Sequence, residues 1–439
     1  MDEEYINRLI YEYNPQWKGE LEVEEFKRPL YFEVKKYMPK KQIIGITGLR
    51  RVGKTTLMKQ ILSELKPEEC IFFSFDEEET HRKEVLVYVI NYFLNNFNGK
   101  YIFLDEIHYI PDWQGILKRF YDTMSIKFVI SGSASLEIKK GKESLAGRIM
   151  TSHMPCLTFR EYLELKGKKV QSVNLNFKDL SLLYNSLLPE KEYFEHEFRQ
   201  YLYKGAFPEI VEEEDEEFIR RYIRDIVVKK IIYSDIPDLF EIKRRDLLFD
   251  LFKHICSESS NLFEIKNLCN IFNADYTTIS NYLHYLKLSF LINIAQTYSK
   301  SSSARLRKNK KVYVIHPSLA FAILNYPKDI LGVGKIMGQY VETLFGDKFF
   351  WRSKTKNEVD AVSVTMDQKI LPIEVKYRER GGKITGLYEF MNKFSASKGI
   401  VVTKNTFKKE EVEQGMILYI PAWLFLLADD KPMDYREML

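Results

Sequence analysis

The stretch that decides the fold runs from Gly48 to Thr55 and reads Gly-Leu-Arg-Arg-Val-Gly-Lys-Thr. It matches the pattern G-x-x-x-x-G-K-[ST] in full. The apolar run KQIIGITG predicts a buried strand before it, and VGKTTLMKQILSEL predicts the helix that it opens. Strand, glycine-rich turn and helix are the context that a phosphate-binding loop requires. Its glycines let backbone N–H groups wrap phosphates, and the helix N-terminus adds a favourable partial charge.

The residue types of this loop predict a site for ATP and Mg²⁺. Lys54 would reach the β- and γ-phosphates, and the Thr55 hydroxyl would hold the metal ion. Arg50 and Arg51 would assist nucleotide contacts or a subunit interface, and the sequence does not choose between these roles. The predicted nucleotide-binding residues are Gly48, Arg50, Arg51, Val52, Gly53, Lys54, Thr55 and Thr56.

A second apolar strand, about fifty residues further on, ends in Asp105 and Glu106. Paired with the phosphate-binding loop, this ending is typical of a Walker B site. Asp105 would belong to the Mg²⁺ shell, and Glu106 would orient or deprotonate the attacking water. Both acids are therefore predicted catalytic residues, together with Lys54.

Two later positions are weaker candidates for the same site. The run Phe128–Ser133 predicts the next strand, and a polar residue at its end would face the γ-phosphate. Ser131 is the first choice and Ser133 the alternative, with a simple turn as the plain interpretation. Arg148 is a candidate arginine sensor or finger, acting in the same chain or from a neighbouring subunit. Its alternative is a surface or structural arginine.

The pattern and composition of the whole chain limit the classes of protein to which it can belong. Strand–helix alternation up to about residue 160 predicts a parallel sheet, and helical patterns follow to about residue 240. The 45% hydrophobic content is too high for a disordered chain, and the net charge of +4 indicates no particular partner. Four scattered cysteines predict neither a zinc site nor a disulfide framework, and the seven histidines are interpreted as structural or surface residues. No signal peptide and no apolar run of about 18–20 residues is found, so we expect a cytoplasmic protein without membrane contact.

Residues 242–325 predict a helix, a helix–turn–helix and a β-hairpin, which is the order of a winged helix. Its second helix would present hydroxyl and amide groups to a DNA major groove, and the basic loop Lys300–Lys311 would contact phosphates. The alternative is a protein–protein or lid module with a solvated loop. The predicted DNA-contacting residues are Thr277, Thr278, Ser280, Asn281, Arg305, Arg307, Lys308, Lys310 and Lys311.

Several of these strings together resemble one large prokaryotic family of AAA+ ATPases. They are IIGITGLRRVGKTTLMKQIL, YIFLDEIHYIPDWQGILKRFYD, SGSASLEI, LAGR and YLYKGAFPEI. The resemblance implies ATP binding and hydrolysis, a link to DNA, and a C-terminal domain related to restriction-type nucleases. Because AAA+ proteins often form rings, a homo-oligomer is one expectation, and a monomer or dimer stays open.

The last part of the chain carries a nuclease-like pattern. Asp360, Glu374 and Lys376 have the D-x(10–20)-E-x-K spacing of PD-(D/E)xK nucleases, although Val359 stands where a proline usually precedes the acid. Both acids would bind Mg²⁺, and Lys376 would position water or stabilise charge. Glu342, on the preceding helix, is a third predicted metal ligand. The alternative is an inert nuclease-like fold used for binding.

The sequence therefore predicts an α/β P-loop NTPase of the AAA+ type with four parts. These are a parallel-sheet ATPase core (1–160), a helical lid (161–241), a winged-helix domain (242–325) and an α+β restriction-endonuclease-like domain (326–439). The leading hypothesis is an ATP-dependent machine that holds DNA through its winged helix and carries a nuclease-like domain, with DNA cleavage left open. Its rivals are a nucleotide-dependent signalling or defence switch with an inactive nuclease-like domain, and a DNA-binding regulator with vestigial catalysis.

Overall fold

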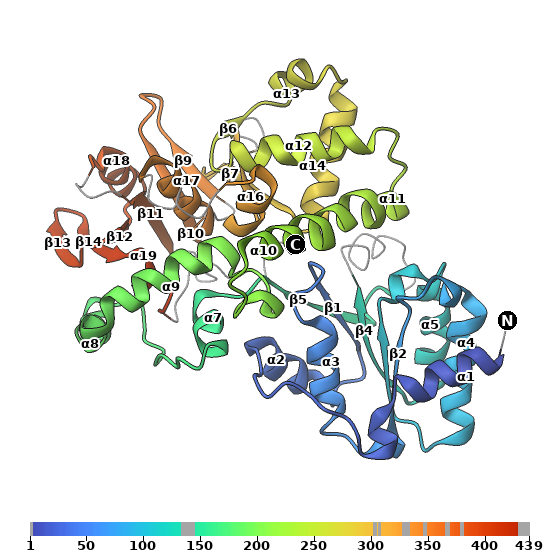
Figure 1. Cartoon of the computed structure of the whole chain (residues 1–439). Coiled ribbons are helices and arrows are strands. Elements are labelled where there is room, and N and C mark those ends of the chain that lie inside the picture. Colours follow the sequence, from blue (N-terminus) through green and yellow to red (C-terminus); the bar gives the residue numbers. More distant parts are fainter. Residues whose placement is uncertain are drawn as a thin grey trace. The chain divides into compact units, whose positions relative to one another are not determined.

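The computed structural model describes residues 3–132, 145–301, 305, 309–326, 334–345, 349–364, 369–377 and 382–428. The chain divides into two compact units, Met1–Pro155 and Cys156–Leu439. Each unit is built around its own sheet (Figure 1).

The first unit contains a five-stranded sheet in the order β2-β3-β4-β1-β5, and all its strands are parallel. Helices cover both faces (Figure 1). Helices α1, α4 and α5 share one apolar core with the sheet, and α2 packs on α3. The elements are α1 Glu3–Glu12, α2 Pro29–Tyr37, β1 Ile43–Gly48, α3 Lys54–Leu62, β2 Cys70–Ser74, α4 Lys83–Asn96, β3 Tyr101–Asp105, α5 Trp113–Thr123, β4 Lys127–Gly132 and β5 Ile149–Met154.

The predicted strand–helix alternation is confirmed, including the strands β1, β3 and β4 and the helix α3 around the phosphate-binding loop. Strand β5 was not predicted. It pairs along the whole of β1, from Ile43 opposite Ile149 to Gly48 opposite Met154. Its sequence, Ile-Met-Thr-Ser-His-Met, lacks the continuous apolar run of the other strands because it lies at the sheet edge and only Met154 is buried.

The second unit begins with helices. Helix α10 runs through two π-helical stretches, Tyr222–Val228 and Ile231–Asp235, into α11. Helices α12, α13 and α14 follow, and α13 packs on α14. The helices are α7 Phe159–Leu165, α8 Phe177–Leu187, α9 Lys191–Lys204, α10 Glu216–Arg221, α11 Ile236–Leu239, α12 Arg245–Ser257, α13 Ile265–Phe272, α14 Tyr276–Leu288, α16 Pro317–Leu324, α17 Gly334–Phe345, α18 Thr385–Phe394 and α19 Ala422–Phe425.

The sheet of the second unit has nine strands in the order β13-β14-β12-β11-β10-β9-β7-β8-β6. The β-hairpin predicted for the winged helix is present as β7–β8, and β10 and β11 form a second antiparallel pair. Strand β7 also pairs with β9, so the sheet is continuous across residue 325. The strands are β6 Leu262–Phe263, β7 Ile292–Thr297, β8 Lys310–Val314, β9 Phe349–Arg352, β10 Glu358–Val364, β11 Ile370–Lys376, β12 Lys398–Thr403, β13 Lys408–Val412 and β14 Gly415–Pro421.

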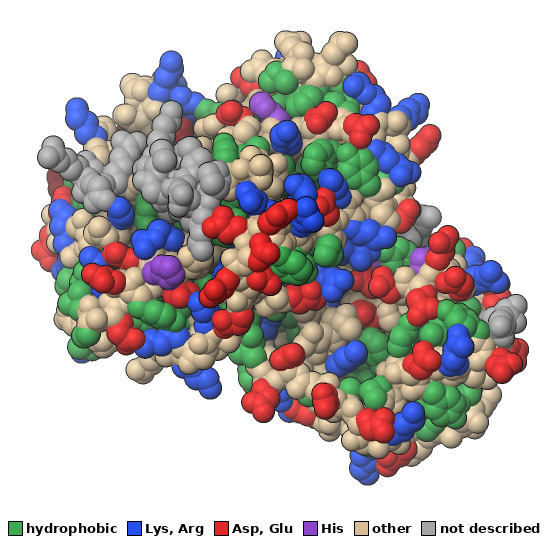
Figure 2. Space-filling model, viewed as in Figure 1, with side chains coloured by type: hydrophobic (Ala, Val, Ile, Leu, Met, Phe, Trp, Pro, Cys, Tyr) green, Lys and Arg blue, Asp and Glu red, His purple; other side chains and the backbone are tan. Residues whose placement is uncertain are grey.

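The distribution of charged side chains, apolar helices and cysteines matches three predictions made from the composition. On the face seen in Figure 2, Lys and Arg side chains are interspersed with Asp and Glu. No helix in the described part of the chain is both long and apolar enough to cross a bilayer. The four cysteines all lie within the described ranges and form no disulfide.

A buried asparagine completes the β2 edge of the first sheet. Asn14 is 1% exposed, and its amide donates to the carbonyl of Phe72 at 2.8 Å and to that of Ile10 at 2.7 Å. Its side-chain oxygen accepts the N–H of Phe72 at 2.7 Å. One side chain thus satisfies both outward-facing backbone groups of Phe72, which would otherwise be unpaired at the edge.

We expect Asn14→Ala to lower the free energy of unfolding by about 2–4 kcal/mol, because it leaves buried backbone groups without partners. Urea unfolding followed by circular dichroism measures this. Asn96→Ala is the matched control, since the exposed Asn96 only bonds the Tyr92 carbonyl, and it should change stability by less than about 0.5 kcal/mol. Equal effects of the two substitutions would contradict the role given to Asn14.

Candidate functional site

The carboxyl ends of three neighbouring strands bring the predicted site together. Strand β4 lies between β1 and β3. The phosphate-binding loop follows β1, Asp105 ends β3, and Ser131 lies one residue before the end of β4. In an open parallel sheet this edge is where ligands bind.

The loop has the backbone conformation that its glycines predict. Gly48 and Gly53 have φ angles of 151° and 99°, and a Cβ on Gly48 would lie 2.3 Å from the carbonyl oxygen of Met154. Helix α3 begins directly after Gly53 without a side-chain cap, so the N–H groups of its first turn are available to an anion. Lys54 is 4% exposed, and its Nζ donates to the carbonyls of Leu49 at 3.0 Å and Gly48 at 3.3 Å.

Asp105 links the end of β3 to the start of α3 and to β4. It is buried, and it accepts a hydrogen bond from the Thr55 hydroxyl at 2.7 Å and another from the Ser131 hydroxyl. Burial and the adjacent Glu106 raise the pKa of Asp105. A divalent cation beside Thr55 and Asp105 would offset both effects and favour the ionised carboxylate.

The Glu106 carboxylate lies between Lys54 and His108. Its φ of 51° turns the chain at the end of β3, and its N–H donates to Ser131 Oγ at 3.2 Å. Its carboxylate lies 3.8 Å from Lys54 Nζ and 3.0 Å from His108 Nδ1. Burial opposes its ionisation, but Lys54 and His108 outweigh burial and hold the pKa of Glu106 well below its ordinary value. Glu106 is therefore an anion at neutral pH, as a water-orienting group must be.

Two histidines of this site were missed by the sequence interpretation. His108 contacts Glu106, and the spacing of two residues in the turn after β3 was the available signal. His153 lies on β5 opposite Thr47 of β1. Burial, with Lys54 and Arg28 nearby, lowers the pKa of His153 to about 4, so it is neutral at pH 7. Nothing in the sequence marks His153, because β5 itself was not predicted.

The remaining loop residues have protein partners. Arg50 donates to the Tyr109 hydroxyl, and the carbonyl of Val52 accepts a bond from Arg28 at 2.9 Å. Arg51 is exposed with a φ of 66°, and Thr56 on α3 is half-buried. Neither predicted role of the two arginines is decided by these contacts. Ser133, the alternative to Ser131, lies outside the described residues.

Arg148 lies away from the phosphate-binding loop of its own chain. It directly precedes β5, beside Ile43 at the amino end of β1, whereas the loop follows the carboxyl end. Its guanidinium donates to both carboxylate oxygens of Asp122, at 2.9 and 3.2 Å. The role predicted for Arg148 within one chain is therefore corrected, because a parallel strand of this length separates the two ends by about 16 Å. A role in a neighbouring subunit stays a prediction.

A second cluster lies in the other unit, around a buried lysine. Lys311 on β8 has a side chain only 3% exposed. Its Nζ lies 2.8 Å from Glu342 and 3.8 Å from Asp360, and it also pairs with Glu358. Although burial alone would lower it, the surrounding carboxylates raise the pKa of Lys311 well above its ordinary value. Lys311 was predicted to contact DNA phosphates, and this is corrected because its ammonium is enclosed by acids.

The predicted nuclease residues lie in this cluster. Asp360 Oδ2 accepts the N–H of Val375 at 2.7 Å, which ties β10 to β11. Lys376 donates to one oxygen of Glu374, and the other oxygen of Glu374 is buried without a hydrogen-bond partner. Among the described residues, no three His, Cys, Asp or Glu side chains are grouped so that they could hold a metal ion. The metal roles of Glu342, Asp360 and Glu374 therefore stay predictions.

The predicted DNA-contacting residues are spread over two elements. On α14, Thr277 and Asn281 are exposed and Ser280 is half-buried. The Thr278 hydroxyl donates to Asp275 at 2.6 Å, and Asp275 caps the helix by accepting the N–H of Thr278 at 2.9 Å. Arg305 and Lys310 are partly exposed. Arg307 and Lys308 lie outside the described residues.

Comparison with known proteins supports the class of the first unit. Residues 40–163 match a family described as an AAA domain. Residues 195–329 and 337–425 match two domains of unknown function, DUF8612 and DUF4143. The AAA match and the parallel five-stranded sheet define a P-loop NTPase α/β fold, the fold of a nucleotide-binding core.

Particular relatives occur in Methanocaldococcus jannaschii. "Uncharacterized protein MJ1637" is 26% identical over 426 residues, covering 90% of this chain and 87% of that protein. "Uncharacterized protein MJ1544" is 28% identical over 301 residues, covering 66% and 63%. Among solved structures, the Hsp104–ADP complex of S. cerevisiae is 14% identical, covers 64% and 42%, and has a TM-score of 0.33. AMPPCP-bound DnaA from Aquifex aeolicus is 16% identical, covers 64% and 92%, and has a TM-score of 0.26. These TM-scores are too low to carry an argument.

The carboxylate cluster predicts a pH dependence of stability. Burial and Asp360 raise the pKa of Glu374 from 4.5 to about 8, with Lys376 opposing them and Glu342 adding to them. The folded state then keeps a proton that the unfolded state loses between these pH values. The stability from this proton is present below the unfolded pKa and is lost as the pH rises through the folded pKa.

Glu374→Gln should therefore flatten the fall in unfolding free energy between about pH 5 and pH 8.5. Urea unfolding of wild type and variant at a series of pH values measures the difference. Glu413→Gln, an exposed change in the β13–β14 turn, is the control and should follow wild type. A Glu374→Gln curve parallel to wild type would show that this carboxyl is already ionised in the folded state.

Proposed function

We propose that this chain is an AAA+ ATP hydrolase that uses Mg²⁺ and acts together with DNA. The observation that carries the proposal is the contact between Thr55 and Asp105 at 2.7 Å, beside a buried Lys54 and an anionic Glu106. The match of residues 40–163 to an AAA domain supports it.

The residues fit a nucleotide triphosphate with its metal ion. Lys54 is a buried ammonium whose hydrogen bonds go to carbonyl oxygens, with the Glu106 carboxylate 3.8 Å away. Phosphate oxygens would give it stronger, charge-assisted hydrogen bonds. The uncapped start of α3 offers further N–H donors. Thr55 and Asp105 supply the hard oxygen ligands that Mg²⁺ prefers, and it usually binds through few protein ligands plus phosphates.

Each residue then has a distinct part in hydrolysis. The bound Mg²⁺ would neutralise charge on the β- and γ-phosphates. Lys54 would bind the same oxygens, and Thr55 and Asp105 would hold the metal shell. Glu106 would accept a hydrogen bond from the attacking water and orient it. Ser131 would keep Asp105 and the backbone of Glu106 in register through its two hydrogen bonds.

Two substitutions separate binding from chemistry. Lys54→Ala should reduce ATP turnover to background, whereas Glu106→Gln should keep ATP binding and lower kcat by about 10²–10⁴-fold. Phosphate release and fluorescent-nucleotide titration measure the two quantities. Lys59→Ala, on the same helix but away from the loop, is the matched control. Turnover retained in Lys54→Ala would exclude this loop as the site.

The second unit supports a link to DNA. Helix α12, strand β6, helices α13 and α14, and the hairpin β7–β8 follow one another in the order of a winged helix. The exposed Thr277 and Asn281 on α14 offer hydrogen-bonding groups suited to a major groove. A nucleotide-dependent switch, in which this unit binds a protein, is the rival proposal.

A nuclease centre is the second candidate function, and Asp360, Glu374 and Lys376 on neighbouring strands favour it. Two carboxylates and a lysine are the groups that metal-assisted phosphodiester hydrolysis uses. Lys311, however, lies 2.8 Å from Glu342 and 3.8 Å from Asp360. A positive charge at this position repels a divalent cation, so we propose that Lys311 suppresses cleavage in the arrangement seen here.

Lys311→Met is therefore expected to cut plasmid DNA in Mg²⁺ at least about tenfold faster than wild type, because the repulsion removed is of the order of several kcal/mol. The double variant Lys311→Met/Asp360→Ala should not cut, and Lys354→Met, which removes an exposed lysine in the turn between β9 and β10, is the control. Circular dichroism verifies that each variant is folded.

Two other results of this assay would change the proposal. Cleavage that is equal in wild type and Lys311→Met, and absent in Asp360→Ala, would show that Lys311 does not oppose the metal ion. No cleavage by any folded variant, with ATP hydrolysis intact, would favour the switch and make the C-terminal part a binding module.

A further inference from the structure

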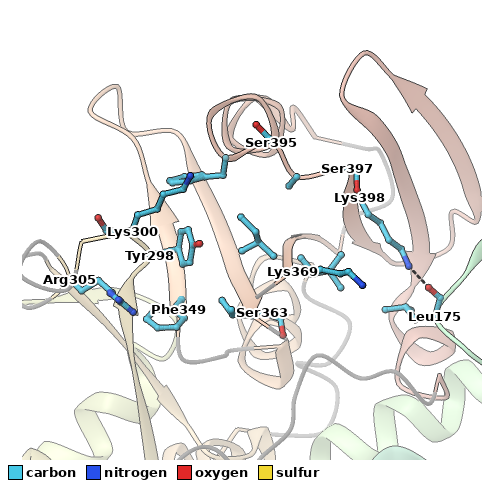
Figure 3. Close-up of a pocket in the computed structure, with 16 residues that line it drawn as sticks. Leu175, Tyr298, Lys300, Arg305, Phe349, Ser363, Lys369, Ser395, Ser397 and Lys398 are labelled. Carbon is cyan, nitrogen blue, oxygen red and sulfur yellow. Dashed lines mark hydrogen bonds between the residues drawn. The ribbon is translucent and has the colours of Figure 1, made fainter. Parts of the chain in front are cut away.

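A large cavity opens at the hairpin end of β10 and β11, apart from the carboxylate cluster. Its volume is about 1360 Å³. The walls come from the segment after β7, the start of β9, the facing ends of β10 and β11, and the connection from α18 to β12. Figure 3 shows Tyr298, Lys300, Arg305 and Phe349 on one side, and Lys369 and Lys398 on the other.

The cavity is positively charged. Lys300 and Arg305 line it from the connection between β7 and β8, Lys369 from the residue before β11, and Lys398 from the start of β12. No Asp or Glu occurs among the described lining residues. Lys398 also donates to the carbonyl of Leu175, which attaches this wall to the segment before α8 (Figure 3). Cations that converge without intervening carboxylates favour an anionic ligand.

The same walls carry aromatic rings. Tyr298 packs edge-on against Phe349 at 5.8 Å and against Phe394 at 5.1 Å between ring centroids. The Arg305 guanidinium lies over the Phe349 ring, 5.5 Å from its centroid. Aromatic faces beside a basic groove are the combination that binds single-stranded nucleic acid, because bases stack on the rings while cations follow the backbone.

The volume of the cavity favours a polymer over a single nucleotide as the ligand. Sites for one small molecule enclose about 300–1,000 Å³, and this cavity is larger and open to solvent. A ligand that fills it must be extended, and several linked nucleotides meet this requirement. Ser363, Ser395 and Ser397 add hydroxyl groups that suit phosphates or base edges.

We propose that this cavity binds a single-stranded segment of nucleic acid. Bases would stack on Tyr298 and Phe349, and phosphates would pair with Lys300 and Lys369. This function goes beyond the recognition of duplex DNA by α14, and it needs neither ATP nor cleavage. Ser363 lies three residues from Asp360 on β10, or about 10 Å along the strand, so the bound strand would pass near the carboxylate cluster.

Fluorescence anisotropy of the full chain without ATP tests this binding. The probes are single-stranded DNA and RNA of about 20 nucleotides and a DNA duplex of equal length. Lys300→Glu/Lys369→Glu changes two exposed side chains. We expect this double variant to weaken single-strand binding at least tenfold and to reduce the salt slope by about 1.4, since each phosphate contact contributes about 0.7.

Two further variants refine the test. Tyr298→Leu should weaken single-strand binding by about 5- to 150-fold, as the loss of one stacked base predicts, with its melting temperature checked against wild type. Lys354→Glu reverses an exposed lysine in the turn between β9 and β10, outside the cavity, and should leave the affinity unchanged. A difference between the DNA and RNA probes would identify which nucleic acid the site prefers.

Several results would overturn the proposal. One is an affinity and a salt slope that do not change in Lys300→Glu/Lys369→Glu. Another is binding of the duplex without binding of the single strands. A third is binding of a polyglutamate of similar length with the same affinity as the single strands. Loss of single-strand binding in Lys54→Ala would also do so, because the oligonucleotide would then occupy the ATP site. Failure of ATP hydrolysis with single-strand binding intact would affect only the proposed ATPase function.

Discussion

The first unit depends on the hydrogen bonds that Asp105 accepts from Thr55 and Ser131. They join the start of α3 and the ends of β3 and β4, which are far apart in sequence, at one buried carboxylate. Hydrogen bonds to a charged group contribute about 1.5–3 kcal/mol each. The same contacts set the direction of Glu106, because its N–H bonds Ser131 and its side chain turns back to Lys54. The geometry for hydrolysis is thus a consequence of how the sheet edge satisfies its polar groups.

In the second unit the central group is a buried cation, the Lys311 ammonium, instead of a buried carboxylate. Glu342, Glu358 and Asp360 converge on Lys311, which comes from the β7–β8 hairpin. Buried carboxylates need a cation, and removing one partner of such a group is strongly unfavourable. A metal ion and Lys311 would meet this need in alternative ways. Under the proposed nuclease function, the balance between them would decide whether the cluster is structural or catalytic.

The sequence predicted the elements that carry strong local signals. The phosphate-binding loop, the acidic end of β3 and the two hairpins had apolar runs or glycine turns of their own. Strand β5 was missed because an edge strand with polar residues has no such run, and β9, which is only four residues long, was not predicted either. Lys311 was placed on the exposed loop because basic residues surround it in sequence. Its burial depends on Glu342 and Asp360, which lie 31 and 49 residues away.

The pairing of β7 with β9 has a consequence for any attempt to divide the chain. Gln296 and Thr297 lie opposite Phe349 and Phe350, so the hairpin and the C-terminal strands share one sheet. A fragment that begins after residue 326 would present β9 as an unprotected edge and would lack Lys311 among the acids. Exposed edges of this kind promote aggregation. The match boundaries at residues 329 and 337 are therefore not boundaries between pieces that can be expected to fold apart.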